Sequence, residues 1–123
     1  MADQDAPIVV FDALKLTTPG TGGNVGPEPV YSRALPMAGR NAVSATLTII
    51  ELEENDGVNA WLQGSSDLQN WLDIGTLVSG SAVGSTQGQR TSIATAFIRV
   101  GVIETSATEA EAMIALTIEK HIL

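Results

Sequence analysis

The sequence of 123 residues contains no cysteine and a single histidine, His121. A disulfide framework and a thiolate metal site are therefore excluded, and a metal cluster of Cys and His cannot be assembled. A Ser/His/Asp triad would have to recruit His121 from near the end of the chain, where an exposed histidine at a strand end is the simpler interpretation. We expect no enzyme activity, no catalytic residue, no metal ligand and no cofactor.

Positive charge is scarce. Fourteen acidic residues outnumber six basic ones, which gives a formal net charge of −8. Proteins that bind nucleic acid need clustered cations to displace counterions, whereas the basic residues here are scattered: Lys15, Arg33, Arg40, Arg90, Arg99 and Lys120. Nucleic acid and anionic membrane surfaces are therefore not expected partners.

Long apolar segments are also missing. No apolar run is long enough to cross a bilayer, and the first residues lack the basic and then apolar pattern of a secretion signal. We therefore expect a protein made in the cytoplasm without a signal peptide. Residues 1–6 are polar and are expected to form a flexible N-terminal arm. Residues 7–123 are expected to form a single domain, because this length suffices to bury one core.

The clearest pattern that is present lies at residues 58–76 and includes both tryptophans. Its first part alternates between a core-facing set and an outward set, which are Val58, Ala60 and Leu62 against Asn59, Trp61 and Gln63. The segment Gly64–Asn70 supplies glycine and the short polar side chains that bend a backbone. The pattern predicts a β-hairpin.

Further strands are predicted at 7–16, 30–35, 42–52, 90–94 and 96–103, and loops at 17–29, 77–89 and 104–111. In the strand at 42–52, Ile50 and Leu52 break the alternation, which indicates a bulge or burial on both faces. The turn at 53–57 ends in Asp-Gly, a strong hairpin signal. Residues 112–121 alternate as a strand, although a capping box and good helix formers precede them; a helical turn is expected at 108–111.

These elements predict an all-β protein, an antiparallel two-sheet sandwich of jelly-roll type with about eight strands. An immunoglobulin-like sandwich without its cysteines is the alternative. The predicted core consists of Val9, Phe11, Leu14, Val43, Leu47, Ile49, Leu62, Trp71, Ile98, Val100, Ile114, Leu116 and Ile118.

The hairpin at 62–75 resembles the G-S-x-D-x-x-x-W hairpin of discoidin-like (galactose-binding-like) jelly rolls, with matches at Gly64, Ser65, Asp67 and Trp71. The strand Phe97-Ile-Arg-Val-Gly-Val is similar to one in which such domains carry an aromatic residue followed by arginine. A hydrophobic strand before and after the hairpin fits too, and the match as a whole covers about a third of the chain. The resemblance implies that the Ser and Asp shape the turn and that the Trp packs beneath it. A similar hairpin occurs in small phage structural proteins, including head-decoration and tail-associated ones.

We therefore expect a non-catalytic structural or assembly protein, such as a capsid decoration protein of a phage virion, that forms a homo-oligomer or binds a larger protein lattice. The arm at 1–6 and the two long loops favour this function, because a neighbouring subunit would order them. The alternative is a carbohydrate-binding, lectin-like module. It would use Trp61 together with Asn59 and Gln63, since an outward ring suits the face of a sugar.

Two other motifs are weaker. Carboxylates suited to calcium surround the turn at 53–57, namely Glu51, Glu53, Glu54 and Asp56, but their spacing does not follow a calcium loop and Asp-Gly already explains the turn. The glycine-rich segment 20–26 lacks the Lys-Ser/Thr of a phosphate loop, and Pro27 and Pro29 prevent the helix that would follow. We expect neither a calcium site nor a phosphate site.

Overall fold

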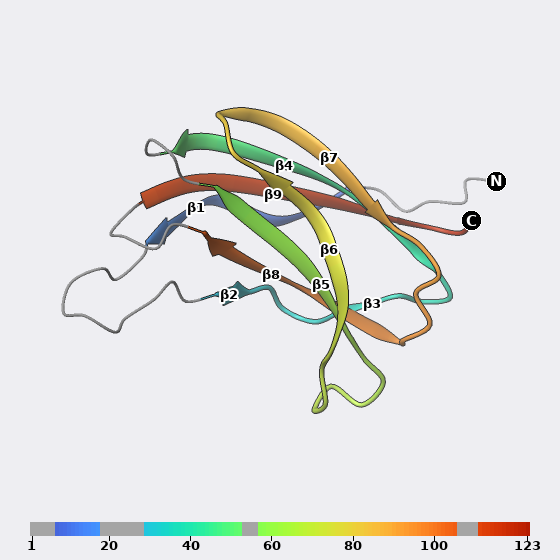
Figure 1. The fold of residues 1–123 in the computed structure, drawn as a ribbon. Helices are drawn as coiled ribbons and strands as arrows, with labels where there is room; N and C mark the ends of the chain where they lie inside the picture. The colour runs from blue at the N-terminus through green and yellow to red at the C-terminus, as the bar shows by residue number, and fades with distance from the viewer. Residues whose placement is uncertain (1–6, 18–28, 53–56, 106–110) are drawn as a thin grey trace.

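The computed structural model of the chain describes residues 7–17, 29–52, 57–105 and 111–123 (Figure 1). The arm predicted for residues 1–6 lies outside these ranges. The described residues form strands and no helix, and so hold no helical segment able to span a membrane. The strands are β1 (Ile8–Thr17), β2 (Val30–Tyr31), β3 (Leu35–Pro36), β4 (Ala42–Leu52), β5 (Val58–Ser65), β6 (Leu72–Gly80), β7 (Gly84–Arg90), β8 (Phe97–Glu104) and β9 (Glu111–His121).

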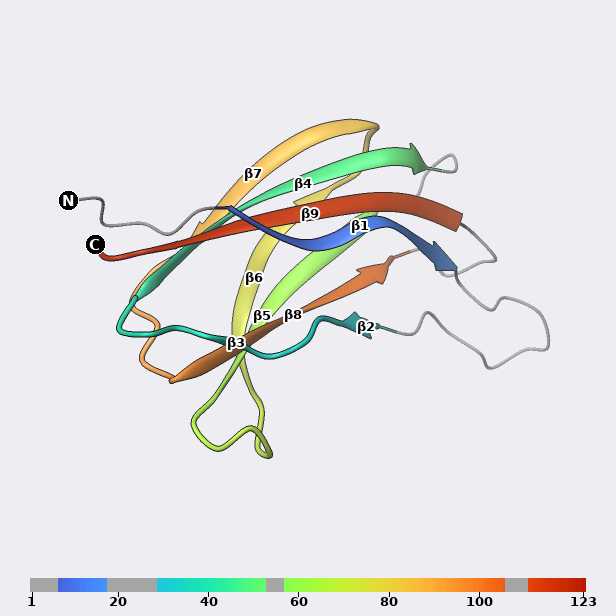
Figure 2. The same cartoon turned by 180° about the vertical axis from the view of Figure 1, so that it is seen from behind.

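The strands form two packed antiparallel sheets (Figures 1 and 2). The four-stranded sheet has the order β1-β9-β4-β7. The five-stranded sheet has the order β2-β8-β5-β6, and β3 also pairs with β8. The strand pairs follow one another outward from the β5–β6 hairpin: next come β4 with β7, then β2 and β3 with β8, and last β1 with β9. The chain therefore has the order of one long hairpin that is folded over into two sheets. This is the jelly-roll arrangement, and it differs from the immunoglobulin-like order.

The predicted sandwich is thus confirmed, and so is the strand number. Both β2 and β3 pair with β8, through Val30 opposite Val102 and Leu35 opposite Ile98. They are two halves of one interrupted strand. At the interruption, the Ser32 N–H donates to the Val100 carbonyl at 2.8 Å, and the Val100 N–H donates to Ser32 Oγ at 2.9 Å. The nine segments therefore correspond to eight strands.

The core lies between the sheets and follows the alternation of the sequence. The inward residues of β4, β5, β8 and β9 are almost fully buried, among them Val43, Leu47, Ile49, Leu62, Ile98, Val100, Ile114, Leu116 and Ile118. Burying each side chain of this kind contributes about 1.5–3 kcal/mol relative to exposure. The bulge indicated in β4 is also present: the register with β9 shifts between Ile49 and Glu51, and Ile50 is exposed.

The core prediction is wrong for two residues, Val9 and Trp71. Val9 is 60% exposed, because β1 is irregular and its register with β9 shifts on both sides of Phe11. Phe11 and Leu14 are only partly buried, although both pack against the core. Trp71 is half-buried and contacts Arg99 rather than the core.

The loop predicted at 77–89 is also wrong. Strand β6 continues to Gly80, with Leu77 and Val78 buried, and β7 follows at 84–90. Strand β7 has no apolar alternation because it is a sheet edge that pairs with β4 through its backbone. A glycine is required at position 88, since a Cβ there would collide with the carbonyl oxygen of Leu77.

At the other boundaries the outcome is mixed. Of the strand predicted at 90–94, only Arg90 lies in a strand. The strand predicted at 112–121 is confirmed, and it starts at Glu111. Glu111 therefore does not belong to the predicted helical turn, whose residues 108–110 lie outside the described part of the chain.

Candidate functional site: an aromatic platform on the five-stranded sheet

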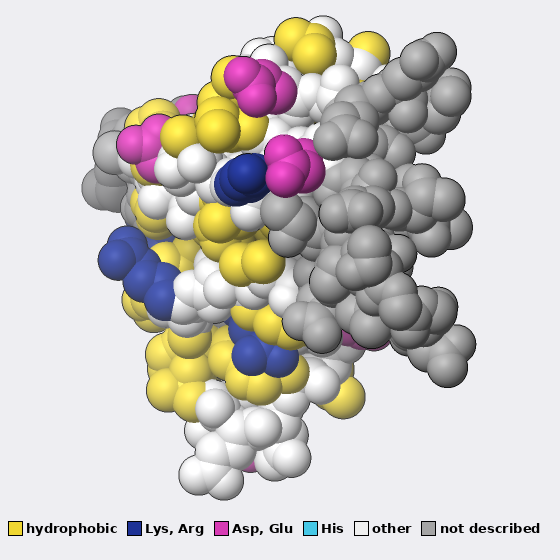
Figure 3. Space-filling model, turned by 90° about the vertical axis from the view of Figure 1, so that its left-hand side faces the viewer, with side chains coloured by type: hydrophobic (Ala, Val, Ile, Leu, Met, Phe, Trp, Pro, Cys, Tyr) yellow, Lys and Arg dark blue, Asp and Glu magenta, His cyan; other side chains and the backbone are white. Residues whose placement is uncertain are grey.

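Three of the five aromatic side chains gather around Arg99 on the outer face of the five-stranded sheet. We call Tyr31, Trp61, Trp71 and Arg99 the aromatic platform. The Arg99 guanidinium carbon lies 4.2 Å from the ring centroid of Tyr31 and 4.4 Å from that of Trp71. Each contact is a cation–π interaction. In Figure 3, hydrophobic side chains surround cationic ones just above the polar loop at the lower end of the molecule.

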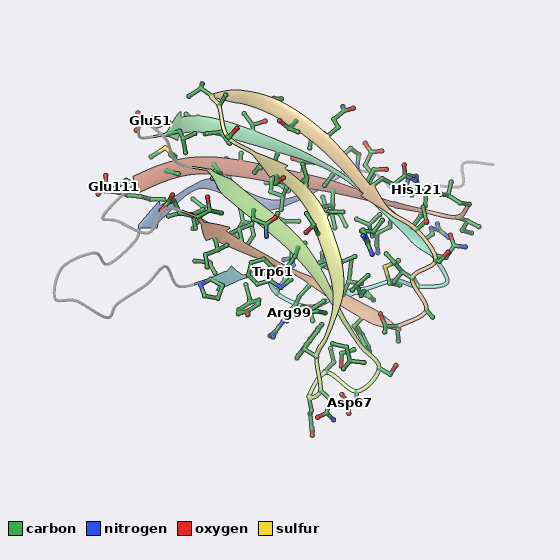
Figure 4. All side chains as sticks on the ribbon, viewed as in Figure 1. Glu51, Trp61, Asp67, Arg99, Glu111 and His121 are labelled. Carbon is green, nitrogen blue, oxygen red and sulfur yellow. The ribbon has the colours of Figure 1, made fainter. Side chains whose placement is uncertain are left out.

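Trp61 lies against the sheet itself. It faces its pairing partner Gly101 on β8, and a Cβ at Gly101 would lie 2.6 Å from Trp61 Cζ2 and 2.9 Å from Tyr31 Cε1. Only glycine therefore leaves room for both rings. The two rings meet edge to face, with centroids 5.8 Å apart at 83°, a favoured geometry for aromatic pairs. Figure 4 shows Trp61 and Arg99 side by side.

A hydrogen-bonded chain braces the platform. Arg99 Nε donates to Gln63 Oε1 at 2.8 Å, and Gln63 Nε2 donates to Asp73 Oδ1 at 2.7 Å. Both ends of the Gln63 amide are therefore occupied within the molecule. The three predicted ligand-binding residues, Asn59, Trp61 and Gln63, do share the outward face of β5, and all three are half-buried. Gln63 therefore links Arg99 to Asp73 and orients the guanidinium.

Sequence reasoning missed Tyr31 and Arg99 as members of this site. They come from β2 and β8, and no periodic pattern connects them with Trp71. The feature of the sequence that could have indicated Arg99 was the predicted strand Phe97-Ile-Arg-Val-Gly-Val. Pairing it with β5 places Arg99 opposite Gln63 and Gly101 opposite Trp61.

The turn between β5 and β6 is built around two side chains that the resemblance singled out. Ser65 Oγ accepts from the N–H groups of Asp67 and Leu68 at 3.2 and 2.9 Å. Asp67 Oδ1 accepts from those of Gln69 and Asn70 at 2.9 and 2.8 Å. These hydrogen bonds stabilise the ionised carboxylate, and the bond from the Asn70 backbone has the largest effect. They hold the pKa of Asp67 well below its usual range. As implied, Ser65 and Asp67 shape the turn.

The other candidate residues lie apart from the platform. His121 Nε2 lies 3.0 Å from Ser44 Oγ, at the opposite end of the molecule from Glu51 and Glu111 (Figure 4). Lys15 Nζ pairs with Glu111 at 3.3 Å. Within the described ranges, no three His, Cys, Asp or Glu side chains are placed to hold a metal ion. Of the carboxylates around the turn at 53–57, Glu53, Glu54 and Asp56 lie outside those ranges.

The outer face of the four-stranded sheet carries a shallow groove of a different kind. Its side chains are hydroxyls, amides and one carboxylate: Ser44, Thr46, Gln87, Gln89, Thr117 and Glu119. This groove offers hydrogen-bond donors and acceptors, and none of its lining residues is aromatic.

Comparison with known proteins identifies the fold and no family. No protein-family model and no curated protein matches the sequence. Among solved structures, the PBSX exported protein XepA is similar over 96% of this chain, with a TM-score of 0.64 and 10% identity. The CBM22-1–GH10 modules of xylanase 10B from Clostridium thermocellum, complexed with xylohexaose, are similar over 96% of this chain, with a TM-score of 0.51 and 12% identity.

These likenesses concern the two-sheet jelly-roll fold, which is the fold that the hairpin resemblance implies. This chain spans only 37% of the length of the first structure and 26% of the second. At this identity the likeness concerns the fold and carries no function across.

Proposed function

We propose that this protein is a non-catalytic assembly protein, and specifically a virion component such as a capsid decoration protein, which acts by docking to copies of itself or to a larger protein lattice. The observation that carries the proposal is the β5–β6 hairpin tip, residues 65–72. The tip projects beyond the sheets (Figure 1) and exposes two large apolar side chains. Leu68 is 48% exposed and Leu72 is 68% exposed.

The tip is held in one conformation before any partner binds. The hydrogen bonds to Ser65 and Asp67 fix its backbone, and Leu68 is held at a φ of +64°. A left-handed conformation is unfavourable for a bulky residue and persists only where the surroundings impose it. A rigid loop loses little entropy on docking, so more of the contact energy of Leu68 and Leu72 appears as affinity.

The test is the molar mass in solution, measured by size-exclusion chromatography with light scattering over a concentration series. We expect the mass to exceed that of the 12.8 kDa chain and to rise with concentration until a closed oligomer or a larger particle forms. The same series at high salt separates apolar docking from charge pairing, because surface ion pairs weaken with salt. A constant monomer mass up to millimolar concentration contradicts self-assembly.

A second candidate, a carbohydrate-binding module, is favoured by the aromatic platform. Trp61 is spread over Gly101 and held by Tyr31, so one pre-oriented indole is available to stack on a sugar ring. Asn59 lies on the same face of β5, two residues before Trp61. The xylanase modules that share the fold are complexed with xylohexaose, which makes a β-linked oligosaccharide the first ligand to examine.

Titration calorimetry with xylohexaose and a broader glycan screen test this candidate. If the parent protein binds, we expect Trp61→Ala to lose at least tenfold in affinity with its circular dichroism spectrum unchanged. Gln87→Ala, on the outer face of the other sheet, is the matched control and is expected to bind as the parent does. If the parent protein binds no glycan, the carbohydrate-binding function is wrong.

A further inference from the structure

We infer that the β5–β6 hairpin tip of one copy docks into a groove on the open edge of a second copy, so that the contact runs head to tail. This inference rests on the proposed assembly function and adds to it the two contacting surfaces. The edge groove lies between β1 and the β2–β3 segment, and its side chains include Ile8, Val9, Val10, Phe11, Arg33 and Leu35.

Among the described residues, the two edges of the sandwich differ, and only one of them is left open. On the β6–β7 edge, Arg90 Nη2 donates to the Ile74 carbonyl at 3.0 Å, and Gly88 sits directly on the Leu77 carbonyl. These contacts close that edge. On the other edge, within residues 7–17, 29–52, 57–105 and 111–123, β1 pairs only with β9, and β2 and β3 pair only with β8. Each of these strands therefore turns one unpaired backbone edge outward, a feature that favours association with another chain.

The open edge also leaves apolar side chains incompletely covered. Ile8, Val10 and Phe11 pack against the core but are only partly buried, and Val9 is 60% exposed. A groove of about 230 Å³ runs between these residues and the β2–β3 segment. Apolar side chains from a partner would complete their burial.

The hairpin tip matches this groove in chemistry. It offers Leu68 and Leu72, which are apolar, exposed and rigidly presented. Its charge is negative, because Asp67 is the one charged residue between Ser65 and Leu72. Among the residues that the structure describes, Arg33 is the only charged one that lines the groove. Apolar contacts at the centre and opposite charges at the rim are the features of specific protein interfaces.

The tip cannot reach the groove of its own chain. In Figure 2 the hairpin extends away from β1 and β2, beyond β3. A contact between two different surfaces is heterologous. Repeating it generates a closed ring if the rotation between neighbouring subunits returns to the first subunit, and an open filament if it does not. The inference therefore predicts growth beyond a dimer.

The test uses two variants that each damage one surface at an exposed position. Leu68→Asp removes the anchor at the tip, and Val9→Asp places a charge in the groove. Each variant alone is expected to weaken self-association at least tenfold and to elute as a monomer. When the two are mixed, the intact groove of one faces the intact tip of the other, so a one-to-one dimer is expected and no larger species. Val83→Asp, an equally exposed valine in the β6–β7 turn, is the control and keeps the parent mass.

The outcomes separate this inference from the proposed function. If the parent protein assembles and both variants keep its mass, the head-to-tail contact is wrong while assembly stands. If both variants are monomers and their mixture stays monomeric, the pairing of tip with groove is likewise overturned. A parent protein that remains a monomer at millimolar concentration overturns the inference together with self-assembly. Circular dichroism and melting temperatures verify that each variant is folded.

Discussion

The outer faces of the two sheets are built by the same alternation and yet differ in almost every other respect. On the four-stranded sheet the outward side chains that line the polar groove are hydroxyls, amides and one carboxylate. On the five-stranded sheet, Trp61 and Arg99 stack with aromatic rings from elsewhere in the chain. The first face carries separate hydrogen-bonded pairs, such as Ser44 with His121 and Thr48 with Ser85, whereas the second is a network in which each side chain positions the next.

This difference determines how the two faces should respond to substitution. An independent surface residue usually contributes within about 0.5 kcal/mol. Residues in one contact network are coupled, and removing one of them leaves the others without support. Matched substitutions on the two faces therefore test whether the platform is a network, and four predictions follow in order of decreasing effect.

The largest effect is expected at Gly101. Gly101→Val places a branched side chain where the rings of Trp61 and Tyr31 lie, and displacing them is expected to cost about 1–3 kcal/mol of unfolding free energy. Ala115→Val, on the outward face of β9, is the matched change on the other sheet and is expected to stay within about 0.5 kcal/mol. Urea denaturation measures both, and tryptophan emission reports the displaced rings. Equal losses of unfolding free energy at the two positions would contradict the network interpretation.

The next effect is expected at Arg99. Arg99→Ala removes two cation–π contacts and the hydrogen bond to Gln63, which together are expected to contribute about 1–2 kcal/mol. Arg99→Lys keeps the charge but loses the flat guanidinium that stacks between two rings, and should recover only part of the loss. Gln87→Ala on the opposite face is the control in the same denaturation experiment. A full rescue by lysine would show that charge alone matters.

A smaller and pH-dependent effect is expected at Asp67. Its folded-state pKa is depressed by the backbone N–H groups of the turn, so its contribution is fully present above the ordinary pKa of about 4 and is lost as pH falls below that value. Asp67→Asn should therefore lower the melting temperature at pH 7, and the gap from the parent should narrow towards pH 2. Asp12→Asn, at an exposed position of β1, controls for the loss of one charge. A gap independent of pH contradicts the role of the ionised carboxylate.

The smallest effect is expected at Leu68, and its sign is opposite. Leu68→Gly relieves the positive φ, and the gain, offset in part by the entropy of glycine, is expected to reach at most about 1 kcal/mol. The melting temperature should rise slightly while self-association weakens, because the apolar anchor is lost. Leu72→Ala, which has no positive φ to relieve, should weaken association without raising the melting temperature. Stronger association of the glycine variant contradicts a docking role for this side chain.

Part of the candidate site was predictable from the sequence. Alternation in β5 placed Asn59, Trp61 and Gln63 on one outward face, and the hairpin motif assigned the turn to Ser65 and Asp67. The partners of Trp61 were not predictable in this way, because Tyr31 and Gly101 reach it only through sheet pairing across long sequence separations. The same limit explains Trp71, whose aromatic character suggested the core although Arg99 holds it on the outer face.

The sequence by itself determined the architecture. In β4, β5, β8 and β9, a side-chain period of two separates buried from outward residues, and that local pattern suffices to specify strands around a two-sheet core. Only the tertiary structure decided that the polar segment 84–90 is a strand and that an arginine lies between two aromatic rings. Strand β7 forms because β4 offers it a backbone to pair with. The platform forms because sheet register brings together residues from β2, β5 and β8 with Trp71, which directly precedes β6. Neither depends on a local pattern, since both arise from pairings that exist only once the chain has folded.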